Sequence, residues 1–281
     1  MNSSCCVCTE GQVVHTLPDG EAVFGVTSLG EEVYVLRLKE GGRDAIEVYD
    51  MITYHLKRCL SIQNTCSFAD MTSCAYFRCL YISDGNAACV HRLDSEGNAE
   101  RWPVNDAPRG LSVNACHNLI VTCCAARRIK EFSPRGDLLH DVKLTDEVVN
   151  PCHAIYLNDA KFVVCHSSCD TVHRVCVTSA DGRHVVHSHG GRRGSDIDQY
   201  NGPAHLAVDN NQFLFVADVN NRRVTLLSPT LNYICQVVSS DQVKWRPMRL
   251  YLDARRRRLY VADNEWKNSQ LTAGRAVVFS V

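Results

Sequence analysis

Short runs of apolar residues recur along this chain at a nearly constant interval. The runs occupy residues 33–37, 80–84, 119–123, 162–166, 214–218 and 259–263, and successive runs end 47, 39, 43, 52 and 45 residues apart. A repeat of about 45 residues is typical of arrays of four-stranded units, the blades of a β-propeller. The spacing therefore predicts an all-β fold of six blades, each made of four antiparallel strands.

Each unit repeats the same order of strands and turns, which is clearest in the fifth. Residues 203–208 form a first apolar strand, 209–211 a polar turn, 213–217 the recurring run, 223–227 a third strand and 233–238 a fourth. The β-branched residues in the runs and the turn-forming residues between them agree with this assignment. We expect blades at about residues 19–65, 66–106, 107–148, 149–198, 199–243 and 244–281.

The sixth unit lacks a fourth strand, because the sequence stops at Val281, after its third. An alternating segment at residues 11–17 precedes the first unit and belongs to none. We expect residues 1–18 to supply the missing strand, because closing the ring removes the two exposed edges of an open array. The chain is then one closed propeller domain spanning residues 1–281.

The composition indicates which partners the protein can bind and in which cellular compartment it lies. Hydrophobic residues make up 45% of the chain and charged residues 22%, and the net charge is -1, so no strong global attraction to nucleic acid or to an anionic membrane is expected. No apolar run approaches the roughly 18 residues of a membrane helix. Many of the 16 cysteines lie inside apolar strands, as small hydrophobes do in a reducing compartment. We expect a cytoplasmic, monomeric protein without membrane association.

The fifth unit carries a motif that resembles a known family. A Gly-rich segment precedes Gln199, Tyr200, Asn201 and Pro203, and residues 216–224 read Val-Ala-Asp-Val-Asn-Asn-Arg-Arg-Val. This pattern resembles the signature of NHL-repeat propellers, and residues 80–90 and 259–264 match it in part. The resemblance implies a six-bladed propeller like that of TRIM-NHL proteins, some of which bind single-stranded RNA on one face. The zinc modules of that family have no counterpart here, so ligase activity is not implied.

Basic and aromatic residues gather in the connections between blades and in the turns after the second strands, which lie on one face of a propeller. Paired arginines suit carboxylate or phosphate groups, and aromatic rings suit stacking. The expected partner-binding face comprises Arg109, Arg127, Arg128, Arg192, Arg193, Tyr200, Arg222, Arg223, Trp245, Arg246, Arg249, Trp266 and Lys267. We expect a non-catalytic platform for a protein or peptide, acidic or phosphorylated. Single-stranded RNA is the alternative ligand for the same face.

The first strands are expected to line a central channel. Aligning them places at its mouth Phe24, Ala69, Gly110, His153, His205 and Arg249. His153 and His205 are one ligand short of an open zinc site, Arg249 would repel a cation, and this alignment contains no carboxylate. No cysteine grouping has the paired short spacing of a structural zinc module. We therefore expect no metal, cofactor or catalytic residue, the alternative being a metal-dependent lactonase or amidating-lyase-like enzyme at the channel.

Overall fold

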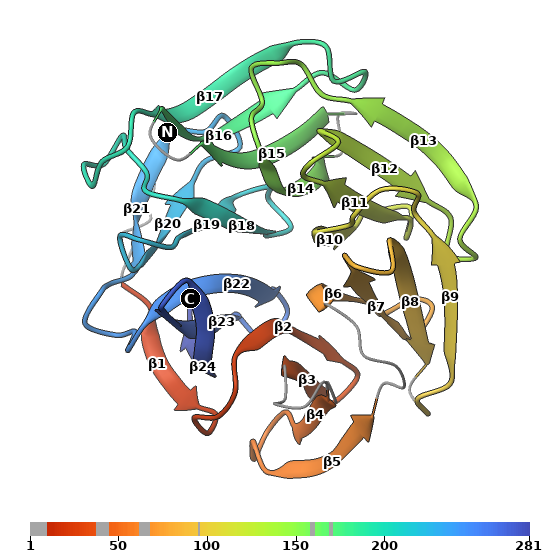
Figure 1. Cartoon of the computed structure of the whole chain (residues 1–281). Helices are drawn as coiled ribbons and strands as arrows, with labels where there is room; N and C mark the ends of the chain where they lie inside the picture. The colour runs from red at the N-terminus through yellow and green to blue at the C-terminus, as the bar shows by residue number, and fades with distance from the viewer. Residues whose placement is uncertain (1–9, 38–44, 62–67, 95, 158–160, 169–170) are drawn as a thin grey trace, which may run out of the picture.

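The protein is a ring of six four-stranded antiparallel sheets (Figure 1). The structure is a computed structural model that describes residues 10–37, 45–61, 68–94, 96–157, 161–168 and 171–281. The predicted all-β, six-bladed propeller is confirmed. Within those ranges no helix is long and apolar enough to cross a membrane.

The strands take equivalent positions in every blade. The innermost strands are β2 (Val23–Leu29), β6 (Phe68–Cys74), β10 (Gly110–Val113), β14 (Pro151–Leu157), β18 (Pro203–Val208) and β22 (Arg246–Asp253). The second strands are β3 (Glu32–Arg37), β7 (Cys79–Asp84), β11 (Leu119–Cys123), β15 (Lys161–Ser168), β19 (Leu214–Asp218) and β23 (Arg258–Lys267). The third strands are β4 (Ala45–Asp50), β8 (Cys89–Asp94), β12 (Arg128–Phe132), β16 (Val172–Thr178), β20 (Arg223–Leu227) and β24 (Gln270–Ser280). The outermost strands are β5 (Leu56–Ser61), β9 (Ala99–Pro103), β13 (Leu138–Lys143), β17 (Val185–Gly191), β21 (Tyr233–Val238) and β1 (Gln12–Thr16).

The recurring apolar runs are the second strands. Every residue of β7, β11 and β19 is buried, whereas β13 on the rim is almost wholly exposed. A second strand is covered on both faces by the neighbouring blades, so both sets of its alternating side chains must be apolar or paired. Each hydrophobic cluster joins two adjacent blades, as where Val163 and Val175 of the fourth pack with Leu206 and Val216 of the fifth.

The ring closes through the N-terminal strand, as predicted. β1 pairs antiparallel with β24, from Gln12 opposite Ser280 to Thr16 opposite Val277. Leu17 follows with its side chain fully buried and donates its backbone N–H to the carbonyl of Ala276 at 2.9 Å. Residues 1–9 of the predicted closing segment lie outside the described residues.

A pair of residues that we call the blade corner recurs in every blade, and in the first, fourth, fifth and sixth blades it binds the connection that precedes the blade. It consists of the fifth residue of each apolar run and the residue opposite it on the third strand. In blade order the corners are Arg37 with Ala45, Asp84 with Cys89, Cys123 with Arg128, His166 with Arg174, Asp218 with Arg223, and Asp263 with Arg275.

Corner side chains bind the backbone of the incoming connection. Asp218 accepts the N–H of Asn201 at 2.8 Å, and His166 Nδ1 accepts the N–H of Val149 at 3.2 Å. In the fifth blade Arg223 donates to the carbonyls of Ser195, Asp196 and Gln199. The corner thus satisfies backbone groups that have no strand partner.

Ring closure predicts a large difference between two apolar residues of the N-terminal segment. Leu17→Ala removes a fully buried side chain and should lower the free energy of unfolding by about 3 kcal/mol. Val14→Ala, at a side chain that is 42% exposed, should change it by less than about 1 kcal/mol. Urea denaturation of both variants measures this, and equal small losses would contradict closure by this segment.

Candidate functional site

The innermost strands place one residue each around the central channel, and a repeated bulge decides which. In five of these strands the register shifts by one residue near the start, as between Pro151 and His153 or between Phe68 and Asp70. The resulting ring consists of Gly25, Asp70, Gly110, His153, His205 and Arg249.

This register corrects the sequence-based ring in two blades. Gly25 occupies the position expected for Phe24, and Asp70 the position expected for Ala69, so the channel does contain a carboxylate. A signal for it was present in the sequence. The ring residue always precedes an apolar residue, Met71 in the second blade as Leu206 in the fifth, and alignment on that residue would have found Asp70.

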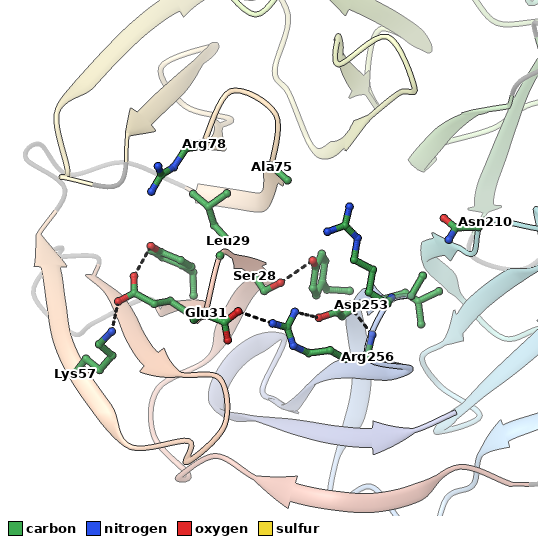
Figure 2. A pocket seen from close by; sticks show the side chains of 16 residues that line it. Ser28, Leu29, Glu31, Lys57, Ala75, Arg78, Asn210, Asp253 and Arg256 are labelled. Atoms are coloured by element: carbon green, nitrogen blue, oxygen red, sulfur yellow. Dashed lines mark hydrogen bonds and ion pairs between the residues drawn. The ribbon is translucent and has the colours of Figure 1, made fainter.

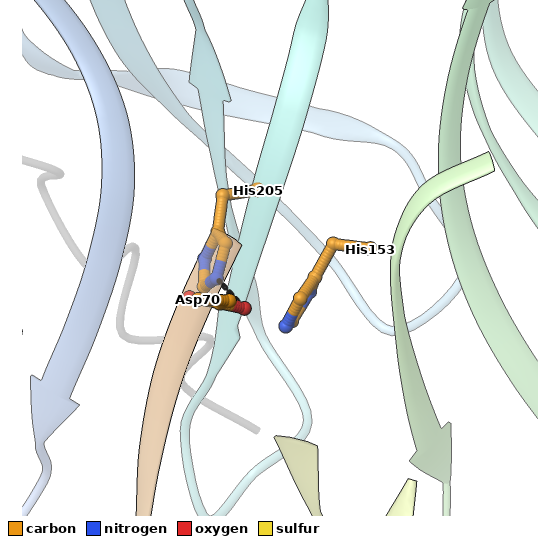
Figure 3. Close-up of side chains that lie close together, drawn as sticks. All are labelled: Asp70, His153 and His205. Carbon is orange, nitrogen blue, oxygen red and sulfur yellow. Dashed lines mark hydrogen bonds and ion pairs between the residues drawn. The ribbon is translucent and has the colours of Figure 1, made fainter. Parts of the chain in front are cut away.

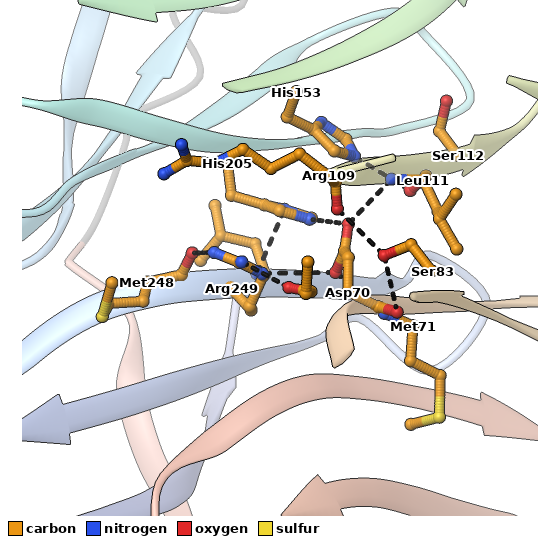
Figure 4. A network of polar contacts seen from close by, with 12 residues as sticks. Asp70, Met71, Ser83, Arg109, Leu111, Ser112, His153, His205, Met248 and Arg249 are labelled. Carbon is orange, nitrogen blue, oxygen red and sulfur yellow. Dashed lines mark hydrogen bonds and ion pairs between the residues drawn. The ribbon is translucent and has the colours of Figure 1, made fainter. Parts of the chain in front are cut away.

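Asp70 is the centre of a buried polar network (Figure 4). Its Oδ1 accepts the N–H of Met71 at 2.9 Å and lies 3.3 Å from Arg249 Nε. Its Oδ2 accepts the N–H of Leu111 at 2.8 Å and lies 3.2 Å from His205 Nε2. Burial pushes the pKa of Asp70 upward, but the interaction with His205, including its hydrogen bond, and the charge of Arg249 outweigh burial and leave the pKa below its ordinary value. Asp70 is therefore an ionised carboxylate with partners on both oxygens.

The two histidines stack against each other beside this carboxylate, with ring centroids 3.8 Å apart (Figure 3). His205 Nδ1 accepts the N–H of Leu250 at 3.3 Å, so the proton on Nε2 faces Asp70. His153 Nε2 lies 2.9 Å from the carbonyl of Leu111, and a carbonyl only accepts, so this nitrogen carries the proton. Nδ1 of His153 is then a bare lone pair, and it has no hydrogen-bond partner in the described part of the chain.

The position of His153 depends on the glycine next to it in the ring. A Cβ on Gly110 would lie 2.6 Å from the carbonyl oxygen of Cys152 and 2.9 Å from His153 Cα. Only glycine lets β10 approach β14 this closely, and that approach brings Leu111 within hydrogen-bond distance of the imidazole. Burial, followed by the neighbouring His205, lowers the pKa of His153 to about 3, so the ring is neutral near pH 7.

Asp70, His153 and His205 each offer a ligand atom within 4.8 Å of the others, so the cluster must be tested as a metal site. Both oxygens of Asp70 already accept backbone N–H groups, and the Arg249 guanidinium stands 3.3 Å from Oδ1. His205 uses both ring nitrogens. The lone pair of His153 Nδ1 is then the one left free in this cluster, whereas a catalytic zinc takes three protein ligands. These residues do not fit a divalent cation.

The predicted partner-binding face is divided between the channel, the corners and the rim. Arg249 and the exposed Arg109 lie at the channel, near His205 (Figure 4). Arg223 is 8% exposed, and its donors go to Asp218 and three backbone carbonyls. Arg222 donates to the carbonyls of Trp245 and Val243. These two arginines hold connections between blades.

Among the described residues, the remaining members of that face form no hydrogen bond or ion pair with the Asp70 network. Arg127 and Arg128 form ion pairs with Asp146 and Asp141 at 2.8 and 2.7 Å. Tyr200 is fully buried and its hydroxyl bonds Thr225. Those with exposed or partly exposed side chains are Arg192, Arg193, Trp245, Arg246, Trp266 and Lys267.

A second hollow lies where the innermost strands end (Figure 2). It has a volume of about 890 Å³ and is lined partly by the turn at residues 254–256. Arg256 pairs there with Glu31 at 2.8 Å and with Asp253 at 3.1 Å, and the hydroxyls of Ser28 and Tyr251 bond at 2.7 Å. Its lining shares no residue with the Asp70 network. Opposite charges balance each other across much of this hollow.

Comparison with known proteins relates the chain to propellers by fold alone. No protein-family model matches it, and no curated protein matches its sequence. Virginiamycin B lyase from Staphylococcus aureus has a TM-score of 0.62 at 9% identity, over 92% of this chain and 87% of that chain. A streptogramin B lyase has 0.61 at 11%, over 95% and 88%, and a chain of the nidogen/laminin complex has 0.61 at 14%, over 81% and 83%.

These comparisons bear on two expectations from the sequence, the non-catalytic binding platform and the NHL-repeat family. The non-catalytic protein- or peptide-binding platform is contradicted, because the similar structures include virginiamycin B lyase and its catalytically inactive histidine-to-alanine variant with quinupristin. That finding favours the enzyme alternative, although identities of 9–11% relate the fold only. The six-bladed propeller is confirmed, whereas membership of the NHL-repeat family is not confirmed by any family match.

The buried neutral His153 predicts a loss of stability in acid. Its pKa is about 3 in the folded protein, against an ordinary value of 6.5, so between these pH values the unfolded chain binds a proton that the folded chain does not. The contribution of neutral His153 to the free energy of unfolding is therefore full well above pH 6.5. It declines by about 2 kcal/mol between pH 7 and pH 5. The variant His153→Gln removes this imidazole and leaves His205, Asp70 and Arg249 unchanged. Its free energy of unfolding, measured by urea denaturation at each pH, should therefore decline less steeply than that of the wild type.

His187→Gln provides the control, because that imidazole is exposed on the outermost strand β17. It should reproduce the pH dependence of the wild type. Identical pH dependence in His153→Gln and the wild type would show that His153 is not held neutral by burial.

Proposed function

We propose that this chain is an enzyme whose reaction centre is the Asp70–His153–His205–Arg249 group in the central channel, and that it acts as a lyase without a bound metal. The observation that carries the proposal is the bare, buried lone pair on His153 Nδ1 beside an ionised Asp70 and a guanidinium. Buried polar atoms without partners are uncommon in folded proteins, and a catalytic role is one explanation for such an atom. The fold-level likeness to two lyases agrees with this reading.

His153 takes the role of general base. Its tautomer is set by the bond from Nε2 to Leu111, so Nδ1 is the atom that receives a proton. With a pKa of about 3 it is a weak base in the unliganded channel. A negatively charged substrate placed against the ring would raise that pKa and thereby strengthen the base. The chemistry of the base therefore favours an anionic substrate.

The guanidinium groups of Arg249 and Arg109 would attract the negative charge of such a substrate. Arg249 lies 13% exposed at the channel and keeps its Nη donors on the carbonyls of Met248 and Ala69, while Arg109 is exposed nearby. Removal of a proton next to a carbonyl creates an enolate, and fixed positive charges in a dry site stabilise such charge strongly. His153 is only 1% exposed, so the proposal requires side chains around the site to move aside when the substrate binds.

His205 takes the role of a positioning residue in an elimination. Its Nε2–H donates to Asp70 at 3.2 Å and its Nδ1 accepts the N–H of Leu250, so the ring that stacks on His153 has a fixed orientation. As His153 takes the proton from carbon, the electron pair of the C–H bond becomes a double bond and the leaving group departs. The leaving group receives a proton from water, and His153 then releases the proton that it took to solvent.

The proposal is tested with His153→Ala and the wild type, after thermal melting shows that both fold. Each protein is incubated with quinupristin and, separately, with a panel of hydroxy-acid esters and lactones that carry a carboxylate. Mass spectrometry and absorbance of the new double bond follow turnover. Wild type should convert at least one compound, and His153→Ala should convert it about 10²- to 10⁴-fold more slowly, the usual contribution of a general base.

Two controls separate this mechanism from others. Addition of EDTA should leave turnover unchanged, and inhibition that zinc or calcium reverses would overturn metal independence. Arg193→Ala, an exposed change outside the channel network, should retain wild-type turnover. Equal turnover by the wild type and His153→Ala, or none by either on every compound, would overturn the proposal.

A further inference from the structure

The corner of the second blade departs from the pattern of the other five. In those five corners one member of the pair is an arginine, namely Arg37, Arg128, Arg174, Arg223 or Arg275. In the second blade the pair is Asp84 with Cys89, and His91 lies two residues further along β8. The third-strand position that holds an arginine in the third to sixth blades is occupied here by a thiol next to an imidazole.

We propose that Asp84, Cys89 and His91 form a binding site for a divalent transition metal of the zinc type. One carboxylate, one thiol and one imidazole form a donor set that zinc accepts. The three candidate atoms lie within 4.8 Å of one another, and the residues are 0%, 6% and 5% exposed. The site is separate from the channel and independent of the proposed reaction there.

The spacing of the ligand atoms matches tetrahedral coordination. Cys89 Sγ lies 3.5 Å from His91 Nε2, and His91 Nε2 lies 3.4 Å from Asp84 Oδ2. With about 2.3 Å from zinc to sulfur and about 2.1 Å to nitrogen or oxygen, tetrahedral angles put these pairs about 3.6 and 3.4 Å apart. The distance of 3.4 Å between His91 and Asp84 is long for a hydrogen bond from nitrogen to oxygen, and a shared cation accounts for it.

The surroundings hold the three ligands in place. Oδ1 of Asp84 accepts the N–H groups of Asn86 and Ala87 at 3.1 and 2.9 Å, which turns Oδ2 toward His91. The ring of Phe68 meets the His91 imidazole edge-on, with centroids 5.7 Å apart. These contacts fix the rotamers before any metal enters, as supporting groups do around metal ligands.

The charges also favour a cation at this corner. A divalent ion would bind the sulfur of Cys89 as a thiolate and release the thiol proton to solvent. Three protein ligands leave a fourth tetrahedral position for water. In the other blades the arginine supplies the positive charge, with no metal needed.

The test uses the full chain, stripped of metal under reducing conditions and titrated with zinc against a chromophoric chelator. Wild type should bind one equivalent, and cobalt(II) in its place should give a thiolate-to-metal charge-transfer band. Cys89→Ser and His91→Gln should lose the band and stoichiometric binding. Cys116→Ser, at an exposed cysteine, should retain both.

Cys89→Arg keeps the test decisive if the other variants unfold. This change rebuilds the Asp–Arg corner of the fifth and sixth blades, so it should fold, bind no zinc and show a melting temperature that EDTA does not change. The wild type should melt at a lower temperature after EDTA. A wild type that binds no zinc, or zinc binding and a cobalt band that persist in both Cys89→Ser and Cys89→Arg, would overturn the proposal.

Discussion

The bond between a corner side chain and the backbone of the incoming connection is the contact on which this ring depends. A connection between blades has no strand beside it, so its N–H and C=O groups must be satisfied by side chains or by water. Asp263 accepts the N–H groups of Lys244 and Trp245, both at 2.8 Å, and Arg37 donates to the carbonyls of Pro18 and Gly274. Each of these bonds sets where the next innermost strand begins. The relative position of two blades therefore follows from a few buried polar contacts placed on an apolar scaffold.

The channel follows from that arrangement. The innermost strands bring one residue each together at equivalent register positions, and in five of the six strands a bulge precedes that residue. Close approach is possible because two ring positions are glycines, Gly25 and Gly110. A carboxylate buried among apolar strands is costly unless it is paired, and Asp70 obtains two backbone donors, His205 and Arg249. In this network His153 Nδ1 and Arg249 Nε are left without a hydrogen-bond partner among the described residues, and His153 Nδ1 is the acceptor of the two.

The same corner position carries different chemistry in different blades without a change of fold. An aspartate faces an arginine in the fifth and sixth blades, a histidine faces an arginine in the fourth, and an aspartate faces a cysteine in the second. Strand pairing is set by backbone hydrogen bonds, so it tolerates these exchanges as long as the buried charge is balanced. Side chains at the corners and in the channel can therefore be exchanged to form a binding or catalytic site while the strand pairing of the propeller is kept.

The sequence by itself determined the blades and their closure, whereas the tertiary structure decided which polar residues meet. The period of the apolar runs reflects local physics: each run is a second strand covered on both faces, as β7 and β19 show, so its pattern is visible without the fold. The unpaired segment before the first unit was equally visible, because an incomplete last blade required it. Asp70 was missed because the first strands of the first two blades were aligned one residue out of register, although the apolar residue that follows each ring position would have corrected this. Its partner His205 is 135 residues away, and Arg222 and Arg223 hold connections rather than face solvent. Contacts of this kind arise only when the ring closes, because they depend on the distance between blades and not on the pattern along any one strand.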